Sequence, residues 1–211
     1  MERETAHLIQ ITGQTQCGKS TIAAKLVMQR TRVIIVSPFP VRERTYPGVE
    51  QFSSVREAVA AFLEFKGGSF RVAVVVRTAA EFAQVCQLAW VLAPCTLVAD
   101  ETTIYLPSAA EAPMEFKLIC QAWAHAGDAH GKESSVDVIF IGQRPINAPP
   151  IFRSEVQVWY LFRLNSASDR NLLRDDFGLT REQADEGGKL PPYTFLRVDR
   201  HGGLTRGKTS V

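Results

Sequence analysis

Eight residues near the start of the chain have the types and spacing of a phosphate-binding loop. Residues 13–20 read Gly-Gln-Thr-Gln-Cys-Gly-Lys-Ser and match the pattern GxxxxGK(S/T) without a gap. The two glycines allow backbone N–H groups to curl around phosphate oxygens, and the N-terminus of the following helix adds a positive end. We therefore expect Lys19 to reach the β- and γ-phosphates of ATP and the Ser20 hydroxyl to bind Mg²⁺. The residues expected to contact the nucleotide are Gly13, Gln14, Thr15, Gln16, Cys17, Gly18, Lys19, Ser20 and Thr21.

Two adjacent carboxylates follow a short apolar segment about 80 residues further on. Residues 95–101 read Cys-Thr-Leu-Val-Ala-Asp-Glu. After a phosphate-binding loop, Asp100 is expected to hold Mg²⁺, and Glu101 to orient and deprotonate the attacking water. An acidic pair at a strand end is by itself also compatible with a solvated surface. The order Asp-Glu favours hydrolysis over transfer to a substrate hydroxyl, because Glu101 then needs only a water to activate.

A third polar group follows another apolar segment. Residues 139–145 read Ile-Phe-Ile-Gly-Gln-Arg-Pro, so that Gln143 comes directly after a predicted strand. Its amide is expected to sense the γ-phosphate or to position the attacking water, although a plain polar strand cap would give the same pattern.

Alternating apolar segments predict the elements that position these residues. Strands are expected at 7–12, 32–37, 70–76, 96–99, 136–142, 156–164 and 193–199. Helices are expected at 20–30, 54–65, 78–92, around 116–123, and at 168–176 and 180–186. Ser54 with Glu57 and Thr78 with Glu81 form two capping boxes. The alternation predicts an α/β P-loop NTPase fold, with a mainly parallel central sheet flanked by helices on both faces.

Composition is that of a globular domain. The 211 residues are 45% hydrophobic and 22% charged, which excludes a wholly disordered chain. The net charge of +2 does not by itself indicate a nucleic-acid partner. The four cysteines form no CxxC pair, so we expect reduced thiols and a cytoplasmic protein. We expect a single domain over 1–211, with its core at 7–199 and a basic, flexible tail at 200–211.

No membrane segment is expected. Residues 82–99 carry no charge over eighteen positions, which is the length of a membrane span. They include Gln84, Gln87 and Pro94, however, and are better explained by a helix, a turn and a buried strand. The first ten residues lack the apolar region of a signal peptide.

The order of GxxxxGKS, LVADE and FIGQRP resembles the FtsK–HerA superfamily of DNA-pumping ATPases, and the similarity covers most of residues 7–175. Two departures stand out. Thr102 and Thr103 follow the acidic pair where the family has a small residue and His. Residues 125–131 read HAGDAHG where the family often has a basic stretch, so its basic residues cannot be transferred.

The expected early start of the first strand leaves no room for the additional domains of FtsK, HerA or the conjugation ATPases. A minimal core of this size resembles the genome-packaging ATPases of membrane-containing icosahedral viruses, of the tectivirus and turreted-virus type. This resemblance implies a homo-oligomeric ring, a pentamer or hexamer, that drives double-stranded DNA into a preformed capsid. It also implies partners at the capsid vertex or among membrane-associated packaging proteins.

A ring ATPase of this kind needs an arginine from the neighbouring subunit to stabilise charge on the γ-phosphate. The candidates are Arg77, Arg144, Arg153, Arg163 and Arg170. Arg77 ends a predicted strand, Arg153 lies in a Pro-rich loop, and Arg144 adjoins Gln143.

Groups that contact DNA are less sharply marked. Lys117, Gln121 and His125 share one face of a predicted helix at four-residue spacing, and Lys132 follows in a polar loop. A solvated helix face would have the same appearance.

Two other functions remain open. A small P-loop kinase would use Arg42 and Arg44 as part of a lid, but it leaves the Gln-Arg-Pro segment unexplained. A nucleotide-dependent assembly or export switch of a phage would hydrolyse little ATP. DNA-stimulated turnover separates the three, because a kinase needs an acceptor and a switch turns over slowly.

Overall fold

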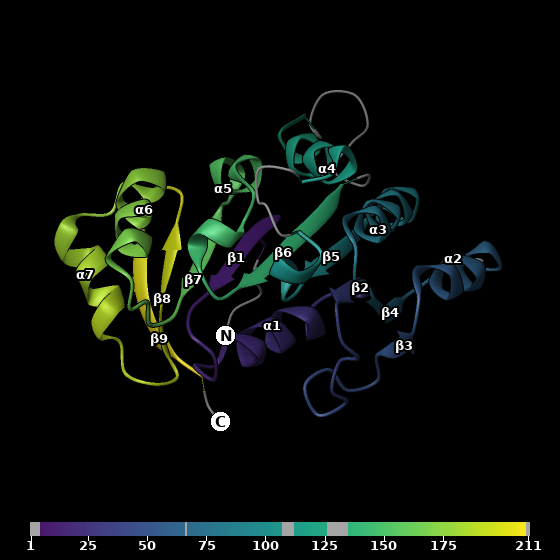
Figure 1. Cartoon of the computed structure of the whole chain (residues 1–211), viewed down its shortest axis with the longest axis horizontal. Helices are drawn as coiled ribbons and strands as arrows, with labels where there is room; N and C mark the ends of the chain where they lie inside the picture. The colour runs from purple at the N-terminus through teal and green to yellow at the C-terminus, as the bar shows by residue number, and fades with distance from the viewer. Residues whose placement is uncertain (1–4, 66, 107–111, 126–134, 210–211) are drawn as a thin grey trace.

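The described residues form one nine-stranded sheet in the order β3-β4-β2-β5-β6-β1-β7-β8-β9 (Figure 1). The computed structural model describes residues 5–65, 67–106, 112–125 and 135–209. Every strand pair from β3 to β7 is parallel, and β8 and β9 add antiparallel pairs at one edge. The strands are β1 (Leu8–Thr12), β2 (Arg32–Ser37), β3 (Glu50–Phe52), β4 (Phe70–Val75), β5 (Cys95–Ala99), β6 (Val136–Gly142), β7 (Val158–Leu161), β8 (Thr194–Asp199) and β9 (Leu204–Lys208).

Helices cover both faces of this sheet (Figure 1). They are α1 (Lys19–Met28), α2 (Val55–Leu63), α3 (Ala79–Val91), α4 (Met114–His125), α5 (Pro150–Glu155), α6 (Ala167–Phe177) and α7 (Arg181–Lys189), with the 3-10 turns η1 (Thr102–Ile104) and η4 (Pro145–Asn147). Within the described ranges, no helix has the length and hydropathy that a membrane crossing requires.

Continuous apolar strands explain the layers. In β2, Val33 and Ile35 pack in the same cluster as α1, whereas Ile34 and Val36 pack in the cluster that contains α2, α3, α4 and α5. Because successive side chains of a strand point to opposite faces, a strand buried on both faces must be apolar throughout. The predicted α/β fold with a mainly parallel sheet and helices on both faces is confirmed.

The local signals at helix starts are largely borne out. Thr78 accepts a hydrogen bond from the Glu81 N–H, and the Glu81 carboxylate accepts one from the Thr78 N–H, so that this capping box is complete. Ser54 likewise caps α2 by accepting from the Glu57 N–H. The Glu57 carboxylate, however, accepts from the N–H of Ser53 rather than from that of Ser54, so the second capping box is only half formed.

The prediction of a flexible tail from residue 200 is wrong for residues 204–208. These residues form β9, which pairs antiparallel with β8. Gly207 lies opposite Phe195, and its lack of a side chain leaves room for the Phe195 ring. The segment LTRGK carries little apolar pattern, so its strand depends on pairing with the edge of β8. The short strand β3 and helix α5 were not predicted for the same reason, since tertiary packing decides them.

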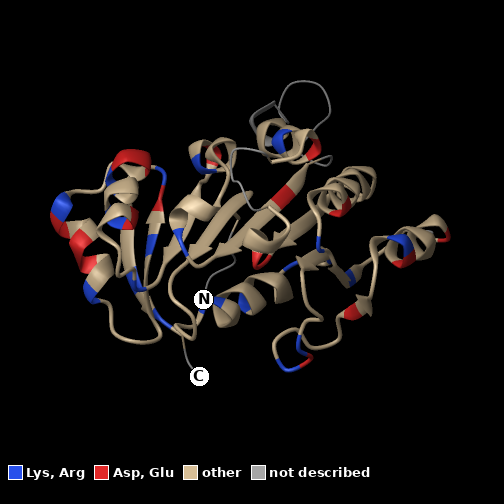
Figure 2. Ribbon diagram, viewed as in Figure 1, with Lys and Arg blue, Asp and Glu red and all other residues tan. Residues whose placement is uncertain are grey.

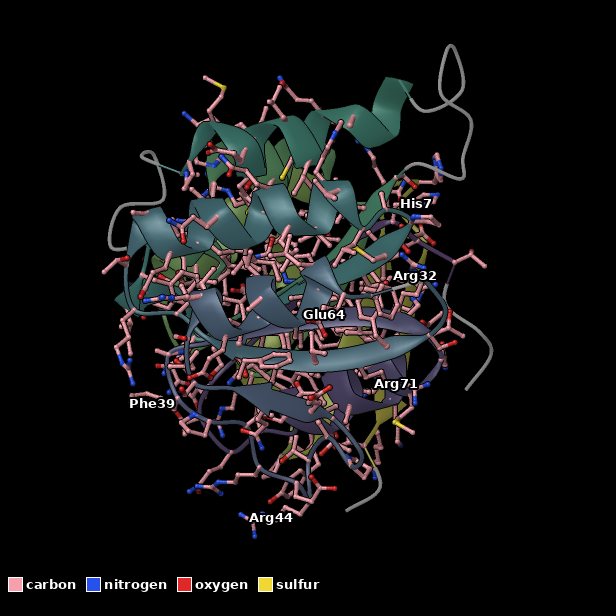
Figure 3. The ribbon with its side chains drawn as sticks, turned by 90° about the vertical axis from the view of Figure 1, so that its right-hand side faces the viewer. His7, Arg32, Phe39, Arg44, Glu64 and Arg71 are labelled. Carbon is pink, nitrogen blue, oxygen red and sulfur yellow. The ribbon has the colours of Figure 1, made fainter. Side chains whose placement is uncertain are left out.

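Parallel strands bring their carboxyl ends to one edge of the sheet. The loop after β1, Asp100 after β5 and Gln143 after β6 therefore lie along the same edge. Figure 3 shows Phe39, just beyond β2, at this edge, and His7, Arg32 and Arg71 at the opposite edge. Ligands of open parallel sheets bind outside the carboxyl ends of strands, so this edge is the place to look for a site.

We predict that Gly207→Val lowers the melting temperature, because the new side chain overlaps the Phe195 ring, whose Cε2 would lie 2.8 Å from an added Cβ. Overpacking of this kind costs about 1–3 kcal/mol. Lys208→Val on the same strand is the matched control, because the Lys208 side chain is exposed. Thermal unfolding followed by circular dichroism measures both. Equal melting temperatures for the two variants would contradict the packing of β9.

Candidate functional site

The loop between β1 and α1 has the backbone of a phosphate cradle. Gly13 has φ +150° and Gly18 has φ +107°, and Gly18 is the N-cap of α1. A Cβ added at Gly13 would collide with the Phe162 side chain and would lie 3.1 Å from Cys17 Sγ. Both conformation and space therefore require glycine at Gly13, which is the structural meaning of the first position of the motif.

The Lys19 side chain hydrogen-bonds back to the start of this loop. Its Nζ donates to the Gly13 carbonyl at 2.8 Å and to the Gln14 carbonyl at 2.7 Å. The ammonium is therefore held at the start of the loop, next to the backbone that would surround a phosphate. Ser20 lies in the first turn of α1 and is exposed, so its hydroxyl is accessible to a ligand.

Strand β7 fixes the loop from the neighbouring side. The Phe162 N–H donates to the Thr12 carbonyl at 2.8 Å, and the Gln14 N–H donates to the Arg163 carbonyl at 3.3 Å. Trp159 Nε1, which is buried, donates to the Thr12 hydroxyl at 2.5 Å. The start of the loop is thus anchored to β7 and to the two residues that follow it.

The acidic pair follows β5 at the same edge. The Asp100 N–H donates to the Val36 carbonyl at 2.9 Å, which continues the pairing of β5 with β2. Glu101 has φ +49°, in the left-handed region, and its N–H donates to Asp100 Oδ1 at 2.9 Å. The Tyr105 hydroxyl donates to the Asp100 carbonyl at 3.0 Å. Backbone in a sparsely populated conformation is typical of functional sites.

The carboxyl group of Asp100 has a raised pKa. Burial raises its pKa from 3.8 to about 6, with a further contribution from the negative charge of Glu101, while the hydrogen bond from the Glu101 N–H and the charge of Lys19 oppose the rise. A cation beside the carboxylate would relieve both causes. The donor set of Asp100 and Ser20 fits Mg²⁺, which prefers oxygen ligands.

Gln143 lies where β6 meets the loop. Gly142 is in register with Thr12 on the adjacent strand β1, so the next residue of each strand, Gln143 and Gly13, emerges at the same edge. Gln143 is exposed. It lines a cavity of about 500 Å³ whose walls are Gln14, Thr15, Gln143, Arg144, Leu164, Asn165, Ser166 and Asp169.

Two of the candidate arginines, Arg153 and Arg170, are held by contacts within their own chain. Arg153 donates through Nε to Asp176 at 2.8 Å and through Nη1 to the Ala148 carbonyl at 3.0 Å, and its side chain is only 14% exposed. Arg170 bonds Asp185 and the carbonyls of the loop before α6. These contacts occupy both guanidinium groups within the chain, and a role for Arg153 in a neighbouring subunit stays a prediction.

Arg144 is paired with a carboxylate of its own chain and is also half-exposed. Its Nε lies 3.1 Å from Asp169 Oδ2, and Asp169 is buried. The hydrogen bond and charge of Asp169 raise the pKa of Arg144 further above its usual range. Half of the Arg144 side chain is nevertheless exposed, on the wall of the cavity that contains Gln143. The buried carboxylate of Asp169 positions this guanidinium. Asp169 itself was not among the residues predicted for the site.

The side chains of Arg77 and Arg163, in contrast, are exposed. Arg77 follows β4 at the carboxyl edge and is exposed, and within the described part of the chain its side chain has no hydrogen-bond or ion-pair partner. Arg163 is also exposed, and its carbonyl accepts the hydrogen bond from Gln14 described above. Both guanidinium groups are available to a ligand or to a second subunit.

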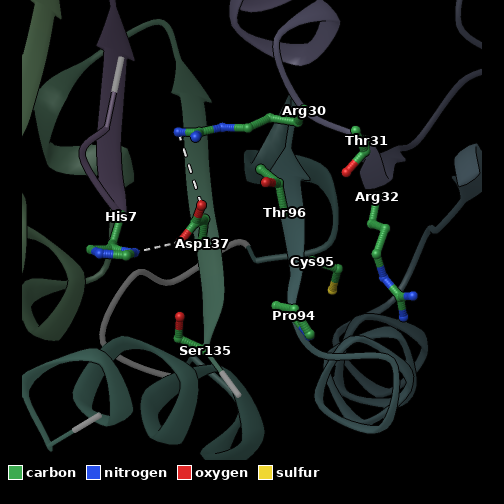
Figure 4. Close-up of a pocket in the computed structure, with 9 residues that line it drawn as sticks. All are labelled: His7, Arg30, Thr31, Arg32, Pro94, Cys95, Thr96, Ser135 and Asp137. Atoms are coloured by element: carbon green, nitrogen blue, oxygen red, sulfur yellow. Dashed lines mark hydrogen bonds and ion pairs between the residues drawn. The ribbon is translucent and has the colours of Figure 1, made fainter. Parts of the chain in front are cut away.

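A second cavity lies at the opposite edge of the sheet (Figure 4). It measures about 240 Å³ and contains the pair His7 Nδ1–Asp137 Oδ1 at 2.6 Å, with Arg30 Nη2 3.9 Å from Asp137 Oδ2. These side chains come from the segment before β1, from β6 and from the residues after α1, and they tie the amino ends of β1 and β6 to the chain that leaves α1. The cavity forms no part of the loop site.

The structure describes the side chains of two of the candidate DNA-facing residues, Lys117 and Gln121. Lys117 is half-buried and Gln121 is exposed on α4. The side chain of His125 and the whole of Lys132 lie outside the described residues. Figure 2 shows Lys and Arg interspersed with Asp and Glu over most elements, which agrees with the small net charge.

Comparison with known proteins bears on the fold. No model of a known protein family matches the sequence, and no curated protein matches it either. Among solved structures, the genome packaging NTPase B204 of Sulfolobus turreted icosahedral virus 2 in complex with AMPPCP has a TM-score of 0.74 at 15% identity, over 98% of this chain and 100% of that chain. The DNA-packaging ATPase B204 of Sulfolobus turreted icosahedral virus gives 0.71 at 16% identity, over 99% and 100%.

VirB4 of Thermoanaerobacter pseudethanolicus has a TM-score of 0.64 at 13% identity, over 97% of this chain and 89% of that chain. At these identities the likeness establishes the fold. This fold is the one that the resemblance stated above implies.

We predict that Asp100→Asn stabilises the nucleotide-free and Mg²⁺-free protein at pH 7. The raised pKa means that ionised Asp100 costs the folded state about 1–3 kcal/mol once the pH exceeds about 6. Below about pH 4 the carboxyl is protonated in both the folded and the unfolded state, so the gain of the variant must disappear there. Urea unfolding of both proteins between pH 4 and pH 7 measures this difference. Asp175→Asn, at an exposed position on α6, is the control. A gain that does not depend on pH would contradict the assigned cause.

Proposed function

We propose that this protein is an ATP-hydrolysing motor that translocates double-stranded DNA and packages a viral genome into a preformed capsid. The observation that carries the proposal is the arrangement of one sheet edge. The Lys19-closed loop, the Asp100–Glu101 pair and the Gln143 amide lie along it. The fold shared with packaging ATPases supports the same conclusion.

The nucleotide site follows from the loop. Backbone N–H groups of residues 13–20 surround the phosphates, and Lys19 exchanges its two carbonyl acceptors for phosphate oxygens. Ser20 and Asp100 hold Mg²⁺, which supplies charge neutralisation on the phosphates when it is bound. Two of the similar structures are complexes with AMPPCP and ATP-γ-S, which supports ATP as the ligand.

Hydrolysis needs a base and an orienting group. Glu101 takes a proton from the attacking water. Its left-handed backbone conformation and the hydrogen bond from its N–H to Asp100 Oδ1 fix the position of its Cα, from which the side chain extends. Gln143 emerges beside the loop and orients the same water or the γ-phosphate. Arg144, held by the buried Asp169, is placed to stabilise negative charge on the wall of the adjoining cavity.

The ring assembly rests on the free arginines. Arg77 is exposed at the nucleotide edge and has no partner among the described side chains, as a residue that acts on a neighbouring subunit would require. Arg163 is the second candidate for the same reason. A pentameric or hexameric ring with DNA in its centre is the form that uses them, in the cytoplasm of the host and next to packaging partners at the capsid vertex or in the membrane.

The kinase and switch alternatives are less well supported. Arg42 and Arg44 lie in the loop after β2 with Glu43 between them, so a lid there would depend on two arginines only, and Gln143 would remain without a role. A switch protein would not need Glu101 beside Asp100.

We predict ATP hydrolysis that is stimulated several-fold by double-stranded DNA. Lys19→Ala abolishes it through loss of phosphate binding. Glu101→Gln lowers kcat by about 10²- to 10⁴-fold while ATP still binds, because only the base is lost. Phosphate release with and without linear DNA, together with calorimetric ATP binding, measures each effect. Turnover that ignores DNA, or that requires a small hydroxyl acceptor, would contradict the motor.

We predict that Arg77→Ala lowers kcat by about 10³-fold without loss of ATP binding, because an arginine finger acts in the transition state. If the arginine acts in trans, mixing Arg77→Ala subunits with Lys19→Ala subunits restores turnover, since each mixed interface can combine an intact loop with an intact arginine. Arg163→Ala is tested in the same way. Arg153→Ala is the contrast: it should lower the melting temperature, with no rescue by mixing. Full activity of both Arg77→Ala and Arg163→Ala would exclude them as fingers.

A further inference from the structure

Tyr193 is an aromatic residue in a conformation that suits glycine or asparagine. Its φ is +60°, and its side chain is 40% exposed. Left-handed backbone is uncommon for bulky residues and costs of order 1–3 kcal/mol, so it persists where the surrounding structure imposes it. The ring is not buried in the core, so packing in the interior does not account for tyrosine at this position.

Two hydrogen bonds join Tyr193 to Thr209, which in turn packs on the phosphate loop. The Tyr193 carbonyl accepts from the Thr209 N–H at 2.8 Å and from the Thr209 hydroxyl at 3.2 Å. Thr209 is buried and packs on Gly18, where an added Cβ would lie 2.7 Å from Thr209 Oγ1. The end of β9 therefore reaches the loop between β1 and α1, as Figure 1 also shows. The chain around Tyr193 borders the first turn of α1.

An aromatic cluster supports the same placement. The Phe195 ring, two residues after Tyr193, packs at 5.6 Å from the Phe162 ring and at 5.4 Å from the Tyr160 ring. Phe162 in turn contacts both Gly13 and Gly18. The start of β8 is thereby fixed relative to the loop by buried side chains, independently of the hydrogen bonds of Thr209.

The other exposed aromatic residues are elsewhere. Among the described residues, the large exposed rings are Phe39, Trp90 and Tyr193. Phe39 follows β2, which is separated from β1 by β5 and β6, and Trp90 lies in α3 on the face away from α1. Only Tyr193 of these three is connected to the loop by contacts. A nucleotide whose phosphates occupy the loop must lead its ribose and base away from it, and Tyr193 is the exposed ring whose backbone is tied, through Thr209, to this loop.

We propose that Tyr193 forms the base subsite of this protein, where its ring stacks on the purine of the bound nucleoside triphosphate. The subsite deepens the proposed function and rests on it, because the phosphates must first occupy the loop. Thr209 acts as a positioning residue that holds the Tyr193 backbone against Gly18. Stacking on the base offsets the conformational cost of tyrosine at a left-handed position.

The experiment compares ATP with inorganic tripolyphosphate, which carries the phosphates without the base. Tyr193→Asn removes the ring but tolerates the positive φ, so the variant should fold at least as well as the wild type. Tyr193→Phe keeps the ring under the same backbone strain and is the matched control. Calorimetric binding of both ligands, with a melting curve for each variant, is measured on the full chain.

The expected result is a loss of ATP affinity of about 10-fold in Tyr193→Asn, with tripolyphosphate affinity unchanged. Tyr193→Phe should bind ATP within about twofold of the wild type. Equal losses for the two ligands, or no loss for either, would overturn the base subsite. If the wild type binds neither ligand, or if Lys19→Ala leaves both affinities intact, the nucleotide site itself fails and the subsite fails with it.

Discussion

The structure depends on the contacts that shape the loop after β1. A chain that curls its N–H groups inward needs glycine at residues with positive φ, close packing beneath, and partners for its carbonyls. Phe162 fills the space below Gly13, and the backbone of Phe162 and Arg163, just after β7, hydrogen-bonds to Thr12 and Gln14. Lys19 Nζ donates to the carbonyls of Gly13 and Gln14. These contacts fix the backbone of the loop in the curled form that the proposed phosphate binding requires.

The parallel sheet converts this local feature into a site. Because β1, β5 and β6 run in the same direction, their carboxyl ends deliver the loop, the Asp100–Glu101 pair and Gln143 to one edge. Burial beside Glu101 raises the pKa of Asp100 to about 6, so the ligand-free protein carries an electrostatic cost there that a bound cation would remove. The same edge exposes Arg77, whose guanidinium has no partner within the described residues.

The sequence predicted what short-range physics decides and missed what tertiary contacts decide. Glycine spacing in residues 13–20, the apolar strands and the Thr78–Glu81 capping box are local signals, and each corresponds to an observed element. The strand β9 was missed because its segment gains its structure only from the edge of β8. The partners of Arg144 and Arg153, the buried Asp169 and the half-buried Asp176, lie more than 20 residues away in the chain, so no spacing rule could show which arginines are free.

Movement along DNA is the property that most directly tests the proposed motor function. A third strand bound to double-stranded DNA is displaced by a motor that travels along the duplex, and the release of a labelled third strand is followed in time. If the protein is a motor, the wild type displaces the third strand only when ATP is present, and Glu101→Gln does not displace it. ATP hydrolysis by the wild type in the presence of DNA, with the third strand left in place, would contradict the central claim.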